Sequence, residues 1–198
     1  MSDTLQPTDL YQLDAGLTDA RRDIAARTRT FVDAEVLPCI ADYHDREEVP
    51  RHLLSGLARL DLLPMLLDDK PDYIAYGLAM RELERGSSTL RSVFSVQGGL
   101  VLHAIKNFGS DAQRARWLQP LANLESLACF ALTEPLFGSN PSGMETRAEK
   151  TARGYRINGH KRWATNGTAA EVALVWAKLD GRICGFLVET NLPGMDMR

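Results

Sequence analysis

The spacing of apolar residues changes once along the chain, from a helical to an extended period, and this change limits the folds open to it. Before about residue 126, apolar residues recur every three to four positions, as in amphipathic helices. After it, apolar and polar residues alternate, as in "VALVWAKL" at 172–179, which is typical of strands. A helical half followed by a β half favours an α+β fold over alternating βαβ units.

Residues 1–125 are predicted to form an all-α helix bundle. The first helix, Thr18–Ile40, carries its apolar residues on one face, and Thr18 can cap its start. Ser110 and Gln113 form a capping box for the fifth helix, which should end near Pro120. The other helices are expected after Pro50, at 73–85 and at 89–108, with Gly109 as a left-handed cap.

Residues 126–198 are predicted to form an antiparallel, barrel-like β domain. We expect Trp163 and Thr165 on the same side of one of its strands, because they are two positions apart. A domain boundary is predicted between Asn123 and Ser126. The expected strands lie in "SLACFALT", "ETRAEKT", "GYRINGHKRWAT", "VALVWAKL" and "RICGFLVET".

Charge and hydropathy exclude some classes of protein. The 198 residues include 23 Lys and Arg against 26 Asp and Glu, without a basic stripe, so nucleic acid is not an expected partner. No apolar run approaches the roughly 20 residues of a membrane span. The stretch "MSDTLQPTDLYQLDAG" has the features of neither a secretory signal nor a transit peptide, so the expected compartment is the cytoplasm.

The cysteines and histidines do not predict a disulfide framework or a metal site. The cysteines are odd in number and widely spaced, and the histidines lack the i, i+4 spacing of a helical zinc site. Reduced thiols and no metal are therefore expected. These residues are Cys39, Cys129, Cys184, His44, His52, His103 and His160.

The loop "LTEPLFGSNPSGMETRA" (132–148) has the composition of a ligand-binding bend. Thr133 stands at a strand end, and the small side chains of Gly138 and Ser139 would let a ligand approach the backbone. With Trp163 nearby, the loop suits a planar heteroaromatic ligand. The spacing leaves open a second interpretation, a polar loop over a core tryptophan.

Longer stretches of the sequence carry a family resemblance. Residues 129–150, "CFALTEPLFGSNPSGMETRAEK", and 155–167, "YRINGHKRWATNG", with residues 75–122 before them, resemble the acyl-CoA dehydrogenase family and most strongly its glutaryl-CoA dehydrogenase branch. The match runs continuously from about residue 73 to residue 198, and the Thr18 helix fits the family's first helix. The resemblance implies an N-terminal helical domain followed by part of a middle β domain.

The resemblance implies flavin-dependent α,β-dehydrogenation of an acyl-CoA thioester. In this family a carboxylate removes the α-proton and the β-hydrogen leaves as hydride to FAD, because no side chain can accept a hydride from such a carbon. Electron-transfer flavoprotein is then the expected electron acceptor. The residues that the resemblance places at FAD are Phe130, Leu132, Thr133, Gly138, Ser139, Trp163 and Thr165.

Similarity to the glutaryl branch implies a substrate with a distal carboxylate, such as glutaryl-CoA or a related short dicarboxylic acyl-CoA, with decarboxylation as a further step. Arg91 matches the branch's substrate-binding arginine, since a guanidinium can hold a carboxylate by two parallel hydrogen bonds. A solvated helix residue is the other interpretation of Arg91. The substrate site implied by the resemblance comprises Glu84, Arg91, Ser92, Ser95 and Ser139.

The family's catalytic glutamate belongs to a C-terminal helical domain that lies beyond the match. Glu134 and Glu189 fall at unsuitable positions, so no catalytic residue is assigned. Two expectations follow. One is a truncated or split dehydrogenase that forms a homo-oligomer or is completed by a second chain. The other is a non-catalytic module, derived from the family, that binds acyl-CoA or flavin or serves in interactions.

Overall fold

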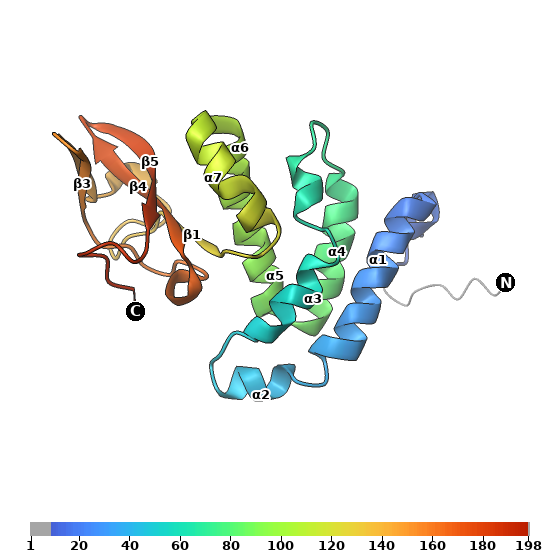
Figure 1. The fold of residues 1–198 in the computed structure, drawn as a ribbon. Helices are drawn as coiled ribbons and strands as arrows, with labels where there is room; N and C mark the ends of the chain where they lie inside the picture. The colour runs from blue at the N-terminus through green and yellow to red at the C-terminus, as the bar shows by residue number, and fades with distance from the viewer. Residues whose placement is uncertain (1–8, 198) are drawn as a thin grey trace.

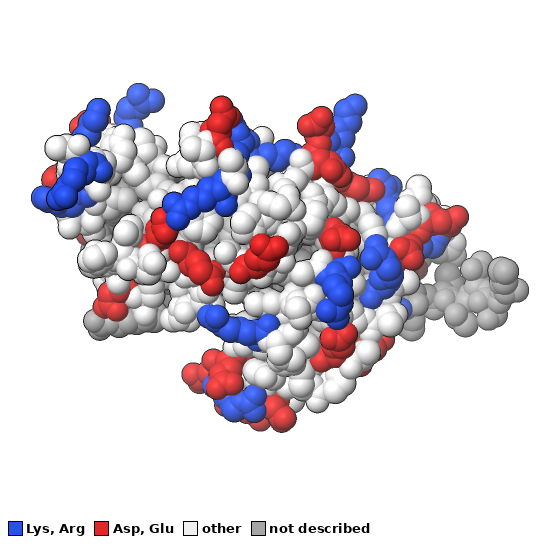
Figure 2. Space-filling model, in the orientation of Figure 1, with Lys and Arg blue, Asp and Glu red and all other residues white. Residues whose placement is uncertain are grey.

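The fold is a helix bundle joined end to end with a β domain (Figure 1). The computed structural model describes residues 9–197, so residues 1–8, to which the targeting prediction also applied, lie outside that range. The predicted α+β class is confirmed. Within the described range no helix is both long and apolar enough to cross a bilayer. On the face shown in Figure 2, acidic and basic side chains are interspersed over the bundle.

The bundle contains seven α-helices in the described range. Helix α1 packs along α4, and α4 packs against α5. Thr18 caps α1 as predicted, since its side chain accepts a hydrogen bond from the backbone N–H of Arg21 at 3.4 Å. The helices are α1 Asp19–Phe31, α2 Ile40–Asp45, α3 Leu54–Ala58, α4 Tyr73–Gly86, α5 Ser88–Phe94, α6 His103–Phe108 and α7 Asp111–Ala122.

The prediction of one continuous first helix to Ile40 is wrong. Helix α1 ends at Phe31, and a π-helical segment, Val32–Val36, follows it. The chain then turns and starts again as α2. Pro38 lies in this turn, and because it has no N–H it cannot continue the helical hydrogen-bond ladder.

The predicted left-handed cap at Gly109 is also wrong, because this residue has extended dihedrals, φ −69° and ψ 151°. Glycine is needed there for space, since a Cβ would lie 2.5 Å from the carbonyl oxygen of Ile105. The capping box after it is confirmed. The Ser110 hydroxyl accepts from the N–H of Gln113 at 3.3 Å, and the Gln113 side chain accepts from the N–H of Ser110 at 2.8 Å.

The sheet is mixed, which corrects the antiparallel prediction. Hairpins β2–β3 and β4–β5 are antiparallel, whereas β1 and β2 both pair with β4 in parallel. Long connections allow this, since 15 residues, 132–146, separate β1 from β2. The strands are β1 Ala128–Ala131, β2 Arg147–Thr151, β3 Gly154–Asn158, β4 Val172–Leu179 and β5 Arg182–Glu189.

Trp163 and Thr165 do not share a strand, contrary to the prediction. Strand β3 ends at Asn158, and Trp163 has a left-handed backbone with φ 58°. After Asn158 the chain no longer pairs with β2, because the next segment forms a backbone hydrogen bond to the loop after β1 instead. The N–H of Arg162 donates to the carbonyl of Thr133 at 2.8 Å.

One hydrophobic core extends across the junction of the two halves. Phe94 and Leu102 of the bundle belong to the same buried cluster as Ala128 of β1 and Val172 of β4. The π-helical segment Ser95–Leu102, between α5 and α6, lies against β1. The predicted domain boundary near residue 125 remains a prediction, but the packing joins the two halves into one unit.

Candidate functional site at the domain junction

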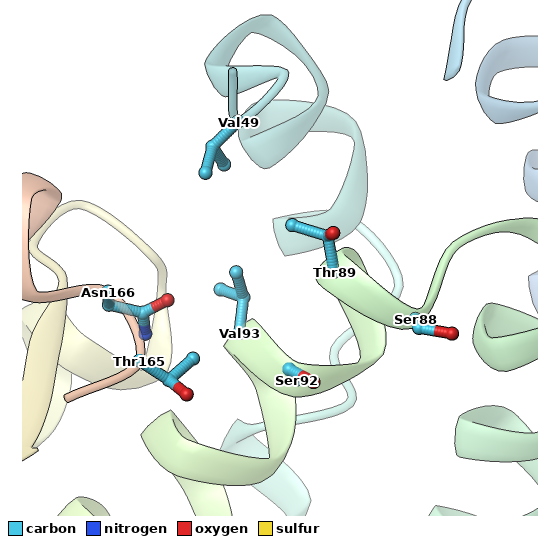
Figure 3. A pocket seen from close by; sticks show the side chains of 7 residues that line it. All are labelled: Val49, Ser88, Thr89, Ser92, Val93, Thr165 and Asn166. Carbon is cyan, nitrogen blue, oxygen red and sulfur yellow. The ribbon is translucent and has the colours of Figure 1, made fainter. Parts of the chain in front are cut away.

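A cavity of about 290 Å³ lies where α5 faces the loop at residues 165–166. Thr165 and Asn166 lie across it from Ser92 and Val93 of α5, and Val49 borders another side (Figure 3). Ser92 was predicted to contact substrate and Thr165 to contact FAD. The structure therefore brings one residue of each predicted set into the same cavity, from different halves of the molecule.

The cavity wall combines hydroxyl groups with an apolar surface. Ser88 and Thr89 add two further hydroxyls, while Val49 and Val93 supply the apolar part. Asn166 was not among the predicted site residues. It has a left-handed backbone with φ 68°, and its side chain donates to the carbonyl of Ala128 at 3.1 Å, which holds the loop to β1. The Asn-Gly pair at 166–167 was the sequence signal for it.

Arg91 does not line this cavity. Its Nε donates to Glu84 at 2.6 Å, and its Nη1 donates to the Ser95 hydroxyl at 3.4 Å. Glu84 also accepts from Ser88 at 2.7 Å. The Arg91 guanidinium, followed by the Ser88 hydroxyl, lowers the pKa of the Glu84 carboxyl. The structure thus gathers Glu84, Arg91 and Ser95 beside the cavity, and their contact with substrate remains a prediction.

The backbone of the predicted flavin loop is joined to the segment that carries Trp163. The Lys161 ammonium donates to the carbonyl of Leu132 at 3.0 Å, next to the Arg162–Thr133 backbone bond. The Trp163 side chain is 77% exposed, and the Arg162 guanidinium lies 4.6 Å from its ring centre. The interpretation of Trp163 as a core tryptophan is therefore wrong. The loop and an exposed indole lie on neighbouring segments.

The remaining predicted flavin residues lie on or just after β1. The Phe130 ring packs against Trp176, with ring centres 5.8 Å apart. Space beside Gly138 is open, since a Cβ there would meet only the Thr133 methyl group, at 4.0 Å. Ser139 is exposed. Their contacts with a cofactor remain predictions.

Glu134 is buried and held as an anion. Burial alone would raise its pKa, but hydrogen bonds from the Glu145 N–H, the Lys161 ammonium and Thr146 outweigh it and lower the pKa to about 2. A carboxylate with such a low pKa is a poor general base at neutral pH. Glu189 is likewise engaged, with an ion pair to Arg116 at 2.7 Å.

Gly159 permits the close packing around Glu134. A Cβ at this position would lie 2.2 Å from the Thr146 hydroxyl oxygen, which itself donates to Glu134. We expect Gly159→Ala to lower the free energy of unfolding by about 2 kcal/mol through overpacking. Urea denaturation measures this change. Gly77→Ala is the control, because a Cβ at Gly77 meets nothing within 4 Å, and an equal loss in both variants would contradict the prediction.

The bundle, the β half and the cavity at their junction define an α+β protein with its candidate site between its two halves. Residues 18–125 match the family description "Acyl-CoA dehydrogenase, N-terminal domain", and residues 129–198 match "Acyl-CoA dehydrogenase, middle domain". The chain belongs to the acyl-CoA dehydrogenase family.

Solved structures and curated relatives agree with this assignment. A glutaryl-CoA dehydrogenase from Mycobacterium smegmatis, solved in complex with FADH2, superposes with a TM-score of 0.88 at 43% identity, over 93% of this chain and 49% of that one. Butyryl-CoA dehydrogenase from Megasphaera elsdenii gives a TM-score of 0.83 at 30% identity, over 90% and 50% of the two chains. The short-chain specific acyl-CoA dehydrogenase of Rattus norvegicus mitochondria is 30% identical over 91% of this chain and 46% of its own length. The chain thus spans about half the length of the curated relatives it matches.

Proposed function

We propose that this chain forms the N-terminal and middle-domain part of an FAD-dependent acyl-CoA dehydrogenase. The observation that carries the proposal is the junction cavity, where Ser92 of α5 and Thr165 of the β domain line one space. A reaction between a bound acyl group and a cofactor needs both molecules to meet. A cavity lined by hydroxyls from both domains is suited to that meeting.

The residues around the loop fit a flavin. The exposed Trp163 indole offers a flat surface, the space beside Gly138 is open, and Thr133 and Thr165 supply hydroxyl groups. Phe130, Leu132 and Ser139 complete the proposed flavin set. Bound FAD would supply the hydride acceptor that no side chain provides. The role left to these residues is to hold and orient it.

The proposed substrate is glutaryl-CoA or a related short dicarboxylic acyl-CoA, with decarboxylation as a further step. Arg91 supports it, because Glu84 and Ser95 hold the guanidinium beside the cavity. Ser92 and Ser139 complete the proposed substrate set. The 43% identity to a glutaryl-CoA dehydrogenase supports the same class, whereas the relative from Rattus norvegicus is a short-chain specific enzyme.

A second proposal is that the chain binds acyl-CoA or flavin without oxidising anything. Glu134 and Glu189 favour it, because both carboxylates are held in ion pairs.

Under the first proposal, the chain is cytoplasmic and passes electrons to electron-transfer flavoprotein. It works there as a homo-oligomer or is completed by a second chain.

Titration of the purified chain with FAD tests the proposal, followed by glutaryl-CoA or butyryl-CoA with an electron-accepting dye. We expect FAD fluorescence to be quenched, and Thr165→Val to weaken FAD binding about ten-fold through the lost hydroxyl. Ser92→Ala should weaken acyl-CoA binding and leave FAD affinity unchanged. Binding without dye reduction would favour the non-catalytic module. A chain that binds neither ligand would refute both proposals.

A further inference from the structure

We infer that Glu134 and Lys161 are positioning residues, whose buried ion pair holds the flavin loop and Trp163 in the arrangement that binds FAD. The inference rests on the proposed function. We call the pair the Glu134–Lys161 clamp. Its two side chains are 3% and 11% exposed, and the carboxylate and ammonium groups are 2.8 Å apart.

Both carboxylate oxygens of Glu134 tie the loop to the start of β2. Oε1 accepts from the N–H of Thr146 at 3.0 Å and from its hydroxyl at 2.5 Å. Oε2 accepts from the N–H of Glu145 at 2.6 Å. With Lys161, four donors hold one buried carboxylate, so its position is fixed in every direction.

Lys161 carries the restraint to the residues proposed to contact FAD. Besides Glu134, its ammonium binds the carbonyl of Leu132 at 3.0 Å. Thr133 therefore lies between two residues bound to the same ammonium, and its own carbonyl accepts from Arg162 at 2.8 Å. The position of the Thr133 side chain then depends directly on the clamp.

The backbone at Trp163 also needs support from its surroundings. A large non-glycine residue with φ 58° lies in a strained region, and such residues persist where neighbouring contacts hold them. The indole is 77% exposed, so packing does not hold it. The hydrogen bonds of Lys161 and Arg162, the two residues before Trp163, therefore restrain its backbone.

A purely stabilising role explains this arrangement less well. A buried ion pair adds little stability beyond what well-packed apolar side chains would give. What the clamp does provide is a fixed register among three segments, at residues 132–134, 145–146 and 161–163. The outer two carry Thr133 and Trp163, and these are the residues a flavin would need in place.

FAD titration of Glu134→Gln, followed by flavin fluorescence and by the visible circular dichroism of bound FAD, tests the inference. We expect affinity to fall about ten-fold and the dichroism to change, while the wild-type chain binds FAD. The control is Glu82→Gln, which removes another buried carboxylate, on a side chain 2% exposed, in the ion-pair network of α1 and α4. It should lower thermal stability and leave FAD affinity within about two-fold.

Variants at Lys161 separate positioning from folding. Lys161→Met should weaken FAD binding as Glu134→Gln does, and Lys161→Arg, which keeps the charge, should restore most of the affinity. If Glu134→Gln and Glu82→Gln changed FAD affinity equally, or if neither changed it, the inference about the clamp would be overturned. The proposed function would still stand. A folded wild-type chain that binds no FAD would overturn the proposed function and the clamp with it.

Discussion

Replacing Gln97 with leucine is expected to lower the free energy of unfolding by about 4 kcal/mol, because the backbone groups of Ser126 and Ala128 would lose their side-chain partner and the carbonyl of Leu121 would lose one of its donors. Gln97 has no exposed surface and lies in the π-helical segment between α5 and α6. Its Nε2 donates to the carbonyls of Leu121 and Ser126 at 3.0 and 2.7 Å, and its Oε1 accepts from the N–H of Ala128 at 2.9 Å. Leucine has a similar volume but cannot make these bonds.

Urea denaturation followed by circular dichroism measures the effect of Gln97→Leu. Gln119→Leu is the control, since this exposed glutamine bonds only a neighbouring side chain, Asn123 at 3.0 Å, and its loss should change stability by less than about 0.5 kcal/mol. Similar losses of stability in the two variants would mean that the hydrogen bonds of Gln97 do not stabilise the junction between the bundle and β1. The large expected difference reflects where the bonds lie, at the junction that forms the candidate site.

The features predicted correctly from sequence are those fixed by neighbours in the chain. Thr18 and Ser110 cap helices because their hydroxyls reach N–H groups three residues on. The β4–β5 turn depends on chain neighbours in the same way, since Asp180 and Gly181 adopt φ 50° and 76° and this pair tolerates left-handed dihedrals. Such interactions depend on short stretches that a single sequence displays.

The features that sequence did not reveal depend on distant partners. An alternating pattern gives the two faces of β4 but not the direction of its neighbours, so the parallel pairing with β1 and β2 was missed. Trp163 was placed in a strand because nothing local shows that Lys161 reaches Glu134, 27 residues earlier.

The candidate site shows the same division. Thr133 and Ser139 lie in the loop that was expected to carry them, whereas Thr165 lies in a turn and not in the predicted strand. That Ser92 and Thr165 share a cavity could not be read from spacing, since they are far apart in the chain and belong to different halves. Tertiary packing brings them together.

Glu82→Gln is expected to lower the free energy of unfolding by about 3 kcal/mol at pH 7, because it removes the buried anion that three arginines share. The Glu82 side chain is 2% exposed, and both of its oxygens accept from Arg29 at 2.9 Å. Arg81 and Arg85 lie within 3.5 and 3.3 Å of it. Without this carboxylate, three positive charges would remain close together between α1 and α4.

The effect of Glu82→Gln should depend on pH in a definite direction. Burial alone would raise the pKa of Glu82, but the hydrogen bonds from Arg29 and Arg85 outweigh it, so the pKa in the folded chain lies below the ordinary value of 4.5. A lowered pKa stabilises the folded state above pH 4.5, and that contribution is lost as the pH falls further. The difference between wild type and variant should therefore be full at pH 7 and shrink below about pH 4.5.

Urea denaturation of wild type and Glu82→Gln between pH 7 and pH 3 measures both predictions. Glu84→Gln is the matched control on the same helix, since its side chain is 47% exposed and solvent screening leaves such surface pairs little effect on stability. A stability difference for Glu82→Gln that stays constant down to pH 3 would contradict the ion-pair account. Because the shape of glutamine is nearly that of glutamate, the charge is what the substitution removes, and an effect of that charge must change with pH.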